Sequence, residues 1–82
     1  NNKESMKKAE TSAAVNMIGT GTTITGDVQS KGDIRVDGTL KGSVSTEGKV
    51  VLGREGVIEG DVACKKADIS GTLKAKITVS QL

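Results

Sequence analysis

One short apolar pattern returns four times along this 82-residue chain, and its spacing limits the fold more than any other feature. Each copy consists of an apolar residue, any residue, a small residue, any residue and a second apolar residue. The copies begin at Ile24, Leu40, Ile58 and Leu73, so their starts lie 16, 18 and 15 residues apart. Internal repeats of this kind are typical of solenoids, in which every repeat forms one coil and stacks on its neighbours.

A second apolar series runs beside the first, at Ile34, Val50 and Ala67, and we place Ile18 at its start because it lies sixteen residues before Ile34. Each of the three later members is followed two residues on by another apolar side chain, which is the period of a β-strand. Glycine or polar residues interrupt these stretches at short intervals, so the strands must be short. We expect four coils, at 18–33, 34–49, 50–66 and 67–82.

Short strands, glycine corners and a repeat near sixteen residues predict an all-β fold, a parallel β-helix whose coils stack about 4.7–4.9 Å apart. An antiparallel array of hairpins fits less well, because it would not bring like residues into register at every turn and because Asp37-Gly38 is the one hairpin dipeptide. The core rungs are expected to be filled by Ile24, Val28, Ile34, Val36, Leu40, Val44, Val50, Leu52, Ile58, Val62, Ile69, Leu73 and Ile77.

The composition excludes several classes of function. The chain has no aromatic residue, no histidine, no proline and one cysteine, so its core must be aliphatic and no intrachain disulfide can form. A structural zinc site would need more cysteine or histidine ligands than these. The net charge of +2 is too small to indicate nucleic-acid binding, and there is no aromatic side chain on which a base could stack. No apolar run is long enough to span a membrane, and no signal peptide is visible.

No cofactor, metal or nucleotide site is expected, and no catalytic residue. The glycine-rich stretch at 19–23 lacks the Gly-Lys-Ser/Thr ending of a phosphate-binding loop. The five aspartates between Asp27 and Asp68 lack the nonapeptide period of calcium-binding β-helices. Cys64 alternates inward from Val62, and without histidine the usual activating base is missing. The sequence therefore predicts a protein that is not an enzyme.

Charged residues lie between the apolar positions and alternate in sign from one repeat to the next. Residues of one series should become neighbours on adjacent coils, where opposite charges favour the correct register. The first series is Thr25, Lys41, Glu59 and Lys74, and the second is Lys31, Glu47, Lys65 and Ser80.

Residues 1–17 lack the repeat and are expected to form a flexible, disordered tail before the β-helix at 18–82. We expect this β-helix of about four coils to be truncated at its C-terminal end. The first and last coils of a β-helix leave backbone groups unpaired and present open edges that can pair with another chain. The side chains expected at such a docking edge are Ile18, Ile77, Val79 and Leu82.

Three runs of sequence resemble the opening coils of bactofilins, the bacterial polymer-forming cytoskeletal proteins: 21–28 (GTTITGDV), 34–42 (IRVDGTLKG) and 58–62 (IEGDV). The resemblance covers 18–82. It implies a right-handed, triangular β-helix that polymerises with itself end to end into non-polar filaments without bound nucleotide. It also implies a cytoplasmic scaffold at the inner face of the membrane, associated with cell-wall synthesis proteins and supporting cell shape. The handedness rests on the resemblance, because the period alone does not fix it.

Two other classes of function are open as hypotheses. An acyltransferase with a left-handed β-helix would need a hexapeptide period and typically a catalytic histidine, and the chain has neither. A non-polymerising adaptor would instead bind membrane lipid or wall-synthesis enzymes through the charged outer series.

Overall fold

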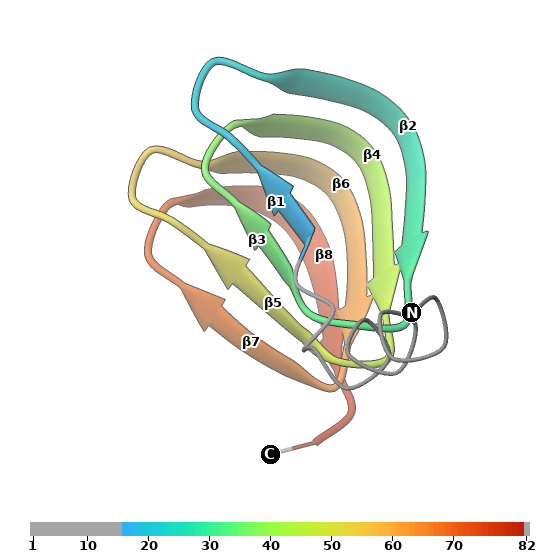
Figure 1. Cartoon of the computed structure of the whole chain (residues 1–82). Helices are drawn as coiled ribbons and strands as arrows, with labels where there is room; N and C mark the ends of the chain where they lie inside the picture. The colour runs from blue at the N-terminus through green and yellow to red at the C-terminus, as the bar shows by residue number, and fades with distance from the viewer. Residues whose placement is uncertain (1–15, 82) are drawn as a thin grey trace, which may run out of the picture.

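A computed structural model describes residues 16–81, in which the chain winds through four coils (Figure 1). Each coil consists of a short strand followed by a long one, and no helix occurs between these residues. The short strands are β1 (Asn16–Ile18), β3 (Ile34–Val36), β5 (Lys49–Leu52) and β7 (Lys66–Ile69). The long strands are β2 (Thr23–Ser30), β4 (Thr39–Thr46), β6 (Val57–Cys64) and β8 (Thr72–Val79).

The strands build two parallel sheets. The short strands follow the order β1-β3-β5-β7 and the long strands the order β2-β4-β6-β8. Neighbours within a sheet are therefore one full coil apart in sequence, which is the topology of a solenoid and not of a hairpin array. The first apolar series stacks in the predicted register, with Ile24, Leu40, Ile58 and Leu73 directly opposite one another. The predicted all-β, parallel β-helix of about four coils is confirmed.

The long strands bend sharply in the middle, as Figure 1 shows for β2, β4 and β6. Each bend is made by a glycine with positive φ, at Gly26 (136°), Gly42 (139°) and Gly60 (130°). A Cβ added to Gly42 or Gly60 would collide with the carbonyl oxygen of the glycine one coil earlier, so these two corners need glycine for space as well as for φ. The fourth coil has Ala75 at this corner, and no non-glycine residue between 16 and 81 has a positive φ, so β8 turns the corner with a different backbone conformation.

Aliphatic side chains from the two middle coils fill the space between the sheets. At the two ends of the solenoid, Ile24, Val28, Leu73 and Ile77 are only partly buried against this core. The core residues with exposed fractions of 0–2% are Ile34, Val36, Leu40, Val44, Val50, Leu52, Ile58 and Val62.

The first coil differs from the prediction in its register. We expected Ile18 to lie opposite Ile34, but Ile18 lies opposite Val36, and Asn16 lies opposite Ile34. The cause is the length of the corner, because residues 19–22 separate β1 from β2, whereas only 37–38 separate β3 from β4. As a result, Asn16 and Met17, which we assigned to the tail, begin β1. The rest of the predicted tail, residues 1–15, lies outside the described residues.

Ile69 also differs from the prediction, because it is 38% exposed although we expected it in the core. Its side chain follows the inward series of β7, in register with Leu52, which is 0% exposed. The two differ because β5 has a strand on either side, whereas β7 has a neighbour on one side only among the described residues. Position in the stack, and not residue type, decides which of these side chains is buried.

One inward column is formed by the last residues of the long strands, and its first members are polar. Thr46 is 6% exposed, and its Oγ1 donates a hydrogen bond to the carbonyl oxygen of Gly32 (2.5 Å) and accepts one from the Gly48 N–H (3.0 Å). Both capacities of the hydroxyl are used, so its burial is compensated. Cys64 follows one coil later at 5% exposure, and burial raises the pKa of its thiol, an effect that a backbone hydrogen bond with Val50 partly offsets. A raised pKa makes this thiol a poor nucleophile at neutral pH, as expected of a core cysteine.

Candidate functional site

The first candidate site is the end face formed by β7 and β8, at the C-terminal end of the stack. Its inward side chains belong to the apolar series, but no further strand covers them among residues 16–81. Ile69 is exposed and the others are partly buried against the preceding coil. The result is an apolar strip along the edge of the solenoid, which we call the C-terminal end face. Its members are Ala67, Ile69, Leu73, Ala75, Ile77 and Val79.

The second candidate site is the end face formed by β1 and β2, the N-terminal end face. Its inward apolar side chains are Ile18, which is 8% exposed, and the half-buried Ile24 and Val28. One corner of this face is polar, because the Asn16 side-chain amide donates a hydrogen bond to Ser30 Oγ at 2.9 Å. The N-terminal end face therefore offers less apolar surface than the C-terminal one.

The structure separates the residues that we predicted at a docking edge. Ile77 and Val79 lie together in β8, whereas Ile18 lies in β1 at the opposite end of the stack. Leu82 lies outside the described residues. Sequence reasoning missed six end-face residues: Ile24, Val28, Ala67, Ile69, Leu73 and Ala75. The available signal was simple, since the first and last members of every stacked series must lie at an end.

The outer columns stack as predicted for the first charged series. Thr25, Lys41, Glu59 and Lys74 are in register on β2, β4, β6 and β8. No pair of them is close enough for an ion pair, because the sole salt bridge between residues 16 and 81 joins Arg35 to Asp37. The alternating charges therefore act on register at a distance, through solvent, where such interactions are weak.

The Arg35–Asp37 pair lies on the outside of β3 and just beyond it. Arg35 Nε and Nη2 donate to the two carboxylate oxygens of Asp37, at 2.9 and 3.2 Å. This two-point hydrogen bond, together with the negative charge of Asp37, raises the pKa of the Arg35 guanidinium. Both side chains are accessible to water, so the pair fixes a corner without forming a reactive centre.

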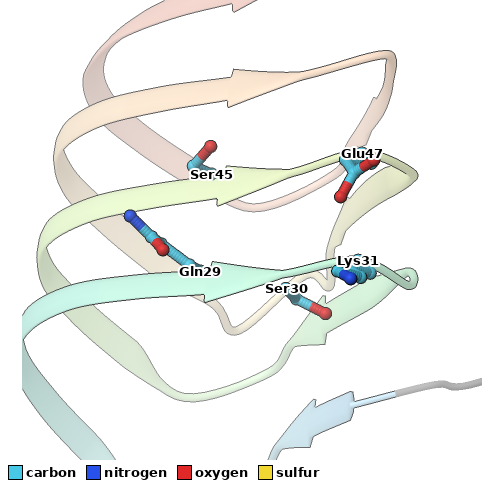
Figure 2. Close-up of a pocket in the computed structure, with 5 residues that line it drawn as sticks. All are labelled: Gln29, Ser30, Lys31, Ser45 and Glu47. Carbon is cyan, nitrogen blue, oxygen red and sulfur yellow. The ribbon is translucent and has the colours of Figure 1, made fainter.

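The second charged series lies at the corner where the long strands end, and Figure 2 shows its first two coils. The Glu47 N–H donates to the carbonyl oxygen of Ser30, which places Glu47 one coil above Lys31. These residues border a shallow hollow of about 430 Å³, which opens on solvent. The side chains that line it are Gln29, Ser30, Lys31, Ser45 and Glu47.

The described residues offer surfaces through which the chain can associate with other molecules. No group of three or more histidine, cysteine, aspartate or glutamate side chains is gathered in metal-binding geometry between residues 16 and 81. The same part of the chain has no helix that is long and apolar enough to cross a membrane. What the described residues present instead is a stack of coils with an apolar face at each end and charged columns along its sides.

Comparison with known proteins agrees with this geometry. A family model, bactofilin, described as polymer-forming cytoskeletal, matches residues 16–82. The chain belongs to the bactofilin family. It is 27% identical over 74 residues to Bactofilin BacO of Myxococcus xanthus (strain DK1622), an alignment that covers 90% of this chain and 59% of that relative. No solved structure matches the chain significantly.

Family membership confirms the resemblance noted in the sequence. Bactofilins are structural cytoskeletal proteins that polymerise with themselves, so the family is not an enzymatic one. The chain spans about 59% of the length of the curated relative that it matches. The particular filament and its partners are therefore matters for proposal.

Proposed function

We propose that this chain is a structural cytoskeletal scaffold that assembles end to end into non-polar filaments without nucleotide. The observation that carries the proposal is the pair of end faces. Within residues 16–81, β2 and β8 each have a neighbouring strand on one side, so each has one edge of backbone N–H and C=O groups available for pairing. An open strand edge can pair with a further strand in either direction, and the like end face of a second copy can supply that strand.

The apolar side chains of the end faces favour such a joint. Leu40 and Ile58, in the middle coils, are 0% exposed, whereas Leu73 and Ile77 are only partly buried. Completing the burial of a half-buried Leu or Ile contributes about 1 kcal/mol. Several such side chains at each joint, added to the backbone hydrogen bonds of a whole coil, support a stable contact between the two end faces.

A non-polar filament requires that like ends meet. Each end face has its own apolar set, Ile18, Ile24 and Val28 at one end and Ile69, Leu73, Ile77 and Val79 at the other. A two-fold contact brings a patch against its own copy, so it needs no complementarity between different ends. Two such contacts, one at each end face, would extend a filament in both directions without giving it a polarity.

We further propose that the filament acts in the cytoplasm at the inner face of the membrane, supporting cell shape or localising wall-synthesis proteins. The support is family membership together with the exposed outer columns, which stay accessible when the ends are engaged. The alternative, a non-polymerising adaptor that binds lipid or wall-synthesis enzymes, relies on the same outer columns. It differs in leaving the end faces free.

Electron microscopy of the purified chain without nucleotide tests the proposal. We expect filaments whose averaged images look the same in both directions along the filament axis. Sedimentation with and without liposomes distinguishes the adaptor. The adaptor would stay a single subunit at all protein and salt concentrations and would sediment only when liposomes are present. That outcome would exclude the filament.

A further inference from the structure

At one corner of the outer surface the alternation of positive and negative side chains is interrupted, because three lysines lie close together. Lys49 of β5 and Lys66 of β7 lie directly opposite each other on neighbouring strands. Lys65 precedes Lys66, and the N–H groups of both point to the Gly48 carbonyl oxygen, at 3.0 and 3.5 Å. Like charges that face each other across neighbouring strands destabilise a sheet, whereas the Lys41–Glu59–Lys74 column avoids this.

The acidic groups near this corner do not neutralise the lysines. Asp33 lies next to Lys49, but its Oδ1 accepts the backbone N–H of Lys49 at 2.8 Å and forms no ion pair with any of the three ammonium groups. Asp68, two residues after Lys66, forms no ion pair with them either. Glu47, two residues before Lys49, forms no ion pair with them either. The side chains that line this corner include three ammonium groups and one carboxylate, that of Asp33, so their balance is positive.

The three lysines frame a hollow in the surface. Its volume is about 270 Å³, below the range of about 300–1,000 Å³ that is usual for sites of drug-sized ligands. Besides the lysines, the lining consists of Asp33, Gly48 and Gln81, so the amide of Gln81 adds a further polar group. A wider hollow adjoins it along Lys49 and Lys66 and continues towards Val79.

We propose that Lys49, Lys65 and Lys66 form a binding site for a phosphate group. An anion with several oxygens can accept hydrogen bonds from all three ammonium groups at once and relieves the repulsion between Lys49 and Lys66. The hollow suits a small, highly charged group better than an apolar ligand. The phosphate can be free in solution or can belong to a lipid headgroup, since the open side of the hollow admits both.

The site uses different side chains from the proposed filament joints. Lys49 and Lys66 are outward side chains of β5 and β7, and Lys65 is the corner residue before β7, whereas the end faces consist of inward side chains. Because β7 is also an edge strand of the C-terminal end face, anion binding is measured on dispersed subunits, which separates it from assembly.

Binding to the whole chain tests the site with two probes. The first is inorganic pyrophosphate, measured by isothermal titration calorimetry. The second is flotation with vesicles of phosphatidylglycerol and phosphatidylcholine, compared with vesicles of phosphatidylcholine alone. Pyrophosphate binding without flotation identifies a soluble phosphate compound as the source, and flotation on the anionic vesicles identifies a headgroup.

The variant K49Q/K65Q/K66Q should lose at least about tenfold in affinity for whichever probe binds, because it removes the three ammonium groups that donate charge-assisted hydrogen bonds to the phosphate. The control K31Q/K41Q/K74Q removes the same net charge elsewhere on the surface and should stay within about twofold of the wild type. Equal losses in both variants would show attraction by net charge and would overturn the site. So would a wild-type chain that binds neither pyrophosphate nor anionic vesicles.

Discussion

The middle coils and the last coil of this solenoid share one apolar sequence pattern, but their side chains differ in burial. Leu40 and Leu73 occupy one column, and Leu40 is 0% exposed while Leu73 is only partly buried. Leu52 and Ile69 differ in the same way in the other sheet. A side chain in this fold is buried by the coils on both of its sides, so a coil has a complete core only when it is stacked between two others. The end faces are thus unfinished cores, which is the physical reason for the self-assembly that we propose.

The corner glycines give the strongest way to test the difference between middle and end. Gly42→Ala should destabilise the chain by roughly 2–6 kcal/mol, because the new Cβ meets the Gly26 carbonyl oxygen and because φ is 139°. Gly26→Ala meets nothing within 4 Å and should cost roughly 1–3 kcal/mol, from its φ alone. Chemical denaturation of dispersed subunits measures both. Equal costs would mean that the stacked carbonyl has no effect.

Truncation in the apolar column gives the next largest effect. Leu40→Ala should cost about 2–5 kcal/mol, because it leaves a cavity between two covered coils. Leu73→Ala removes the same atoms from a half-buried position and should cost about 1–2 kcal/mol in dispersed subunits. In assembled filaments Leu73→Ala should have a second effect, because it also destabilises the joint between subunits. If Leu73→Ala costs as much as Leu40→Ala in single subunits, the last coil is not an open end.

The buried thiol gives a smaller effect that depends on pH. Burial raises the pKa of Cys64 in the folded chain, whereas the unfolded thiol ionises near its ordinary value of 9.0. The stability that this shift contributes is fully present below pH 9.0 and is lost as the pH rises through the pKa of the folded thiol. Thermal unfolding from pH 7 to 10.5 should show a steeper fall for the wild type than for Cys64→Val. Parallel curves would show that Cys64 ionises as readily in the folded chain as in the unfolded one.

Much of the fold follows from the sequence because stacking repeats a simple rule. The column of Ile24, Leu40, Ile58 and Leu73 is predicted correctly, since alternation fixes which face is inward and the repeat fixes which residues meet. The family is also evident from the sequence, because its motifs lie at these corners and strands.

The errors occur where the repeat changes length. The corner at 19–22 is two residues longer than that at 37–38, so counting sixteen residues back from Ile34 gives the wrong partner for Ile18. The pairing of Lys49 with Lys66, in contrast, follows from the predicted series, since Val50 lies opposite Ala67 one residue later. The partner of Ile18 cannot be read from a constant period, because corner lengths vary independently of the apolar pattern.

Polar groups in the interior were missed for a different reason. Thr46 occupies an inward position that an apolar series does not predict, and its burial depends on the hydrogen bonds with Gly32 and Gly48. Those partners belong to two different corners and are brought together only by the fold.

The central claim is that the apolar end faces join one subunit to the next. Ile77→Lys places a charge on the C-terminal end face, while Thr78→Lys adds the same charge to the neighbouring, outward-facing position of β8. Circular dichroism establishes that both variants are folded, and electron microscopy without nucleotide then compares them with the wild type. We expect filaments from the wild type and from Thr78→Lys, and from Ile77→Lys no assembly beyond the dimer that the opposite end face still permits. Filaments of normal length from Ile77→Lys, or a wild type that remains a single subunit at every concentration, would contradict the claim.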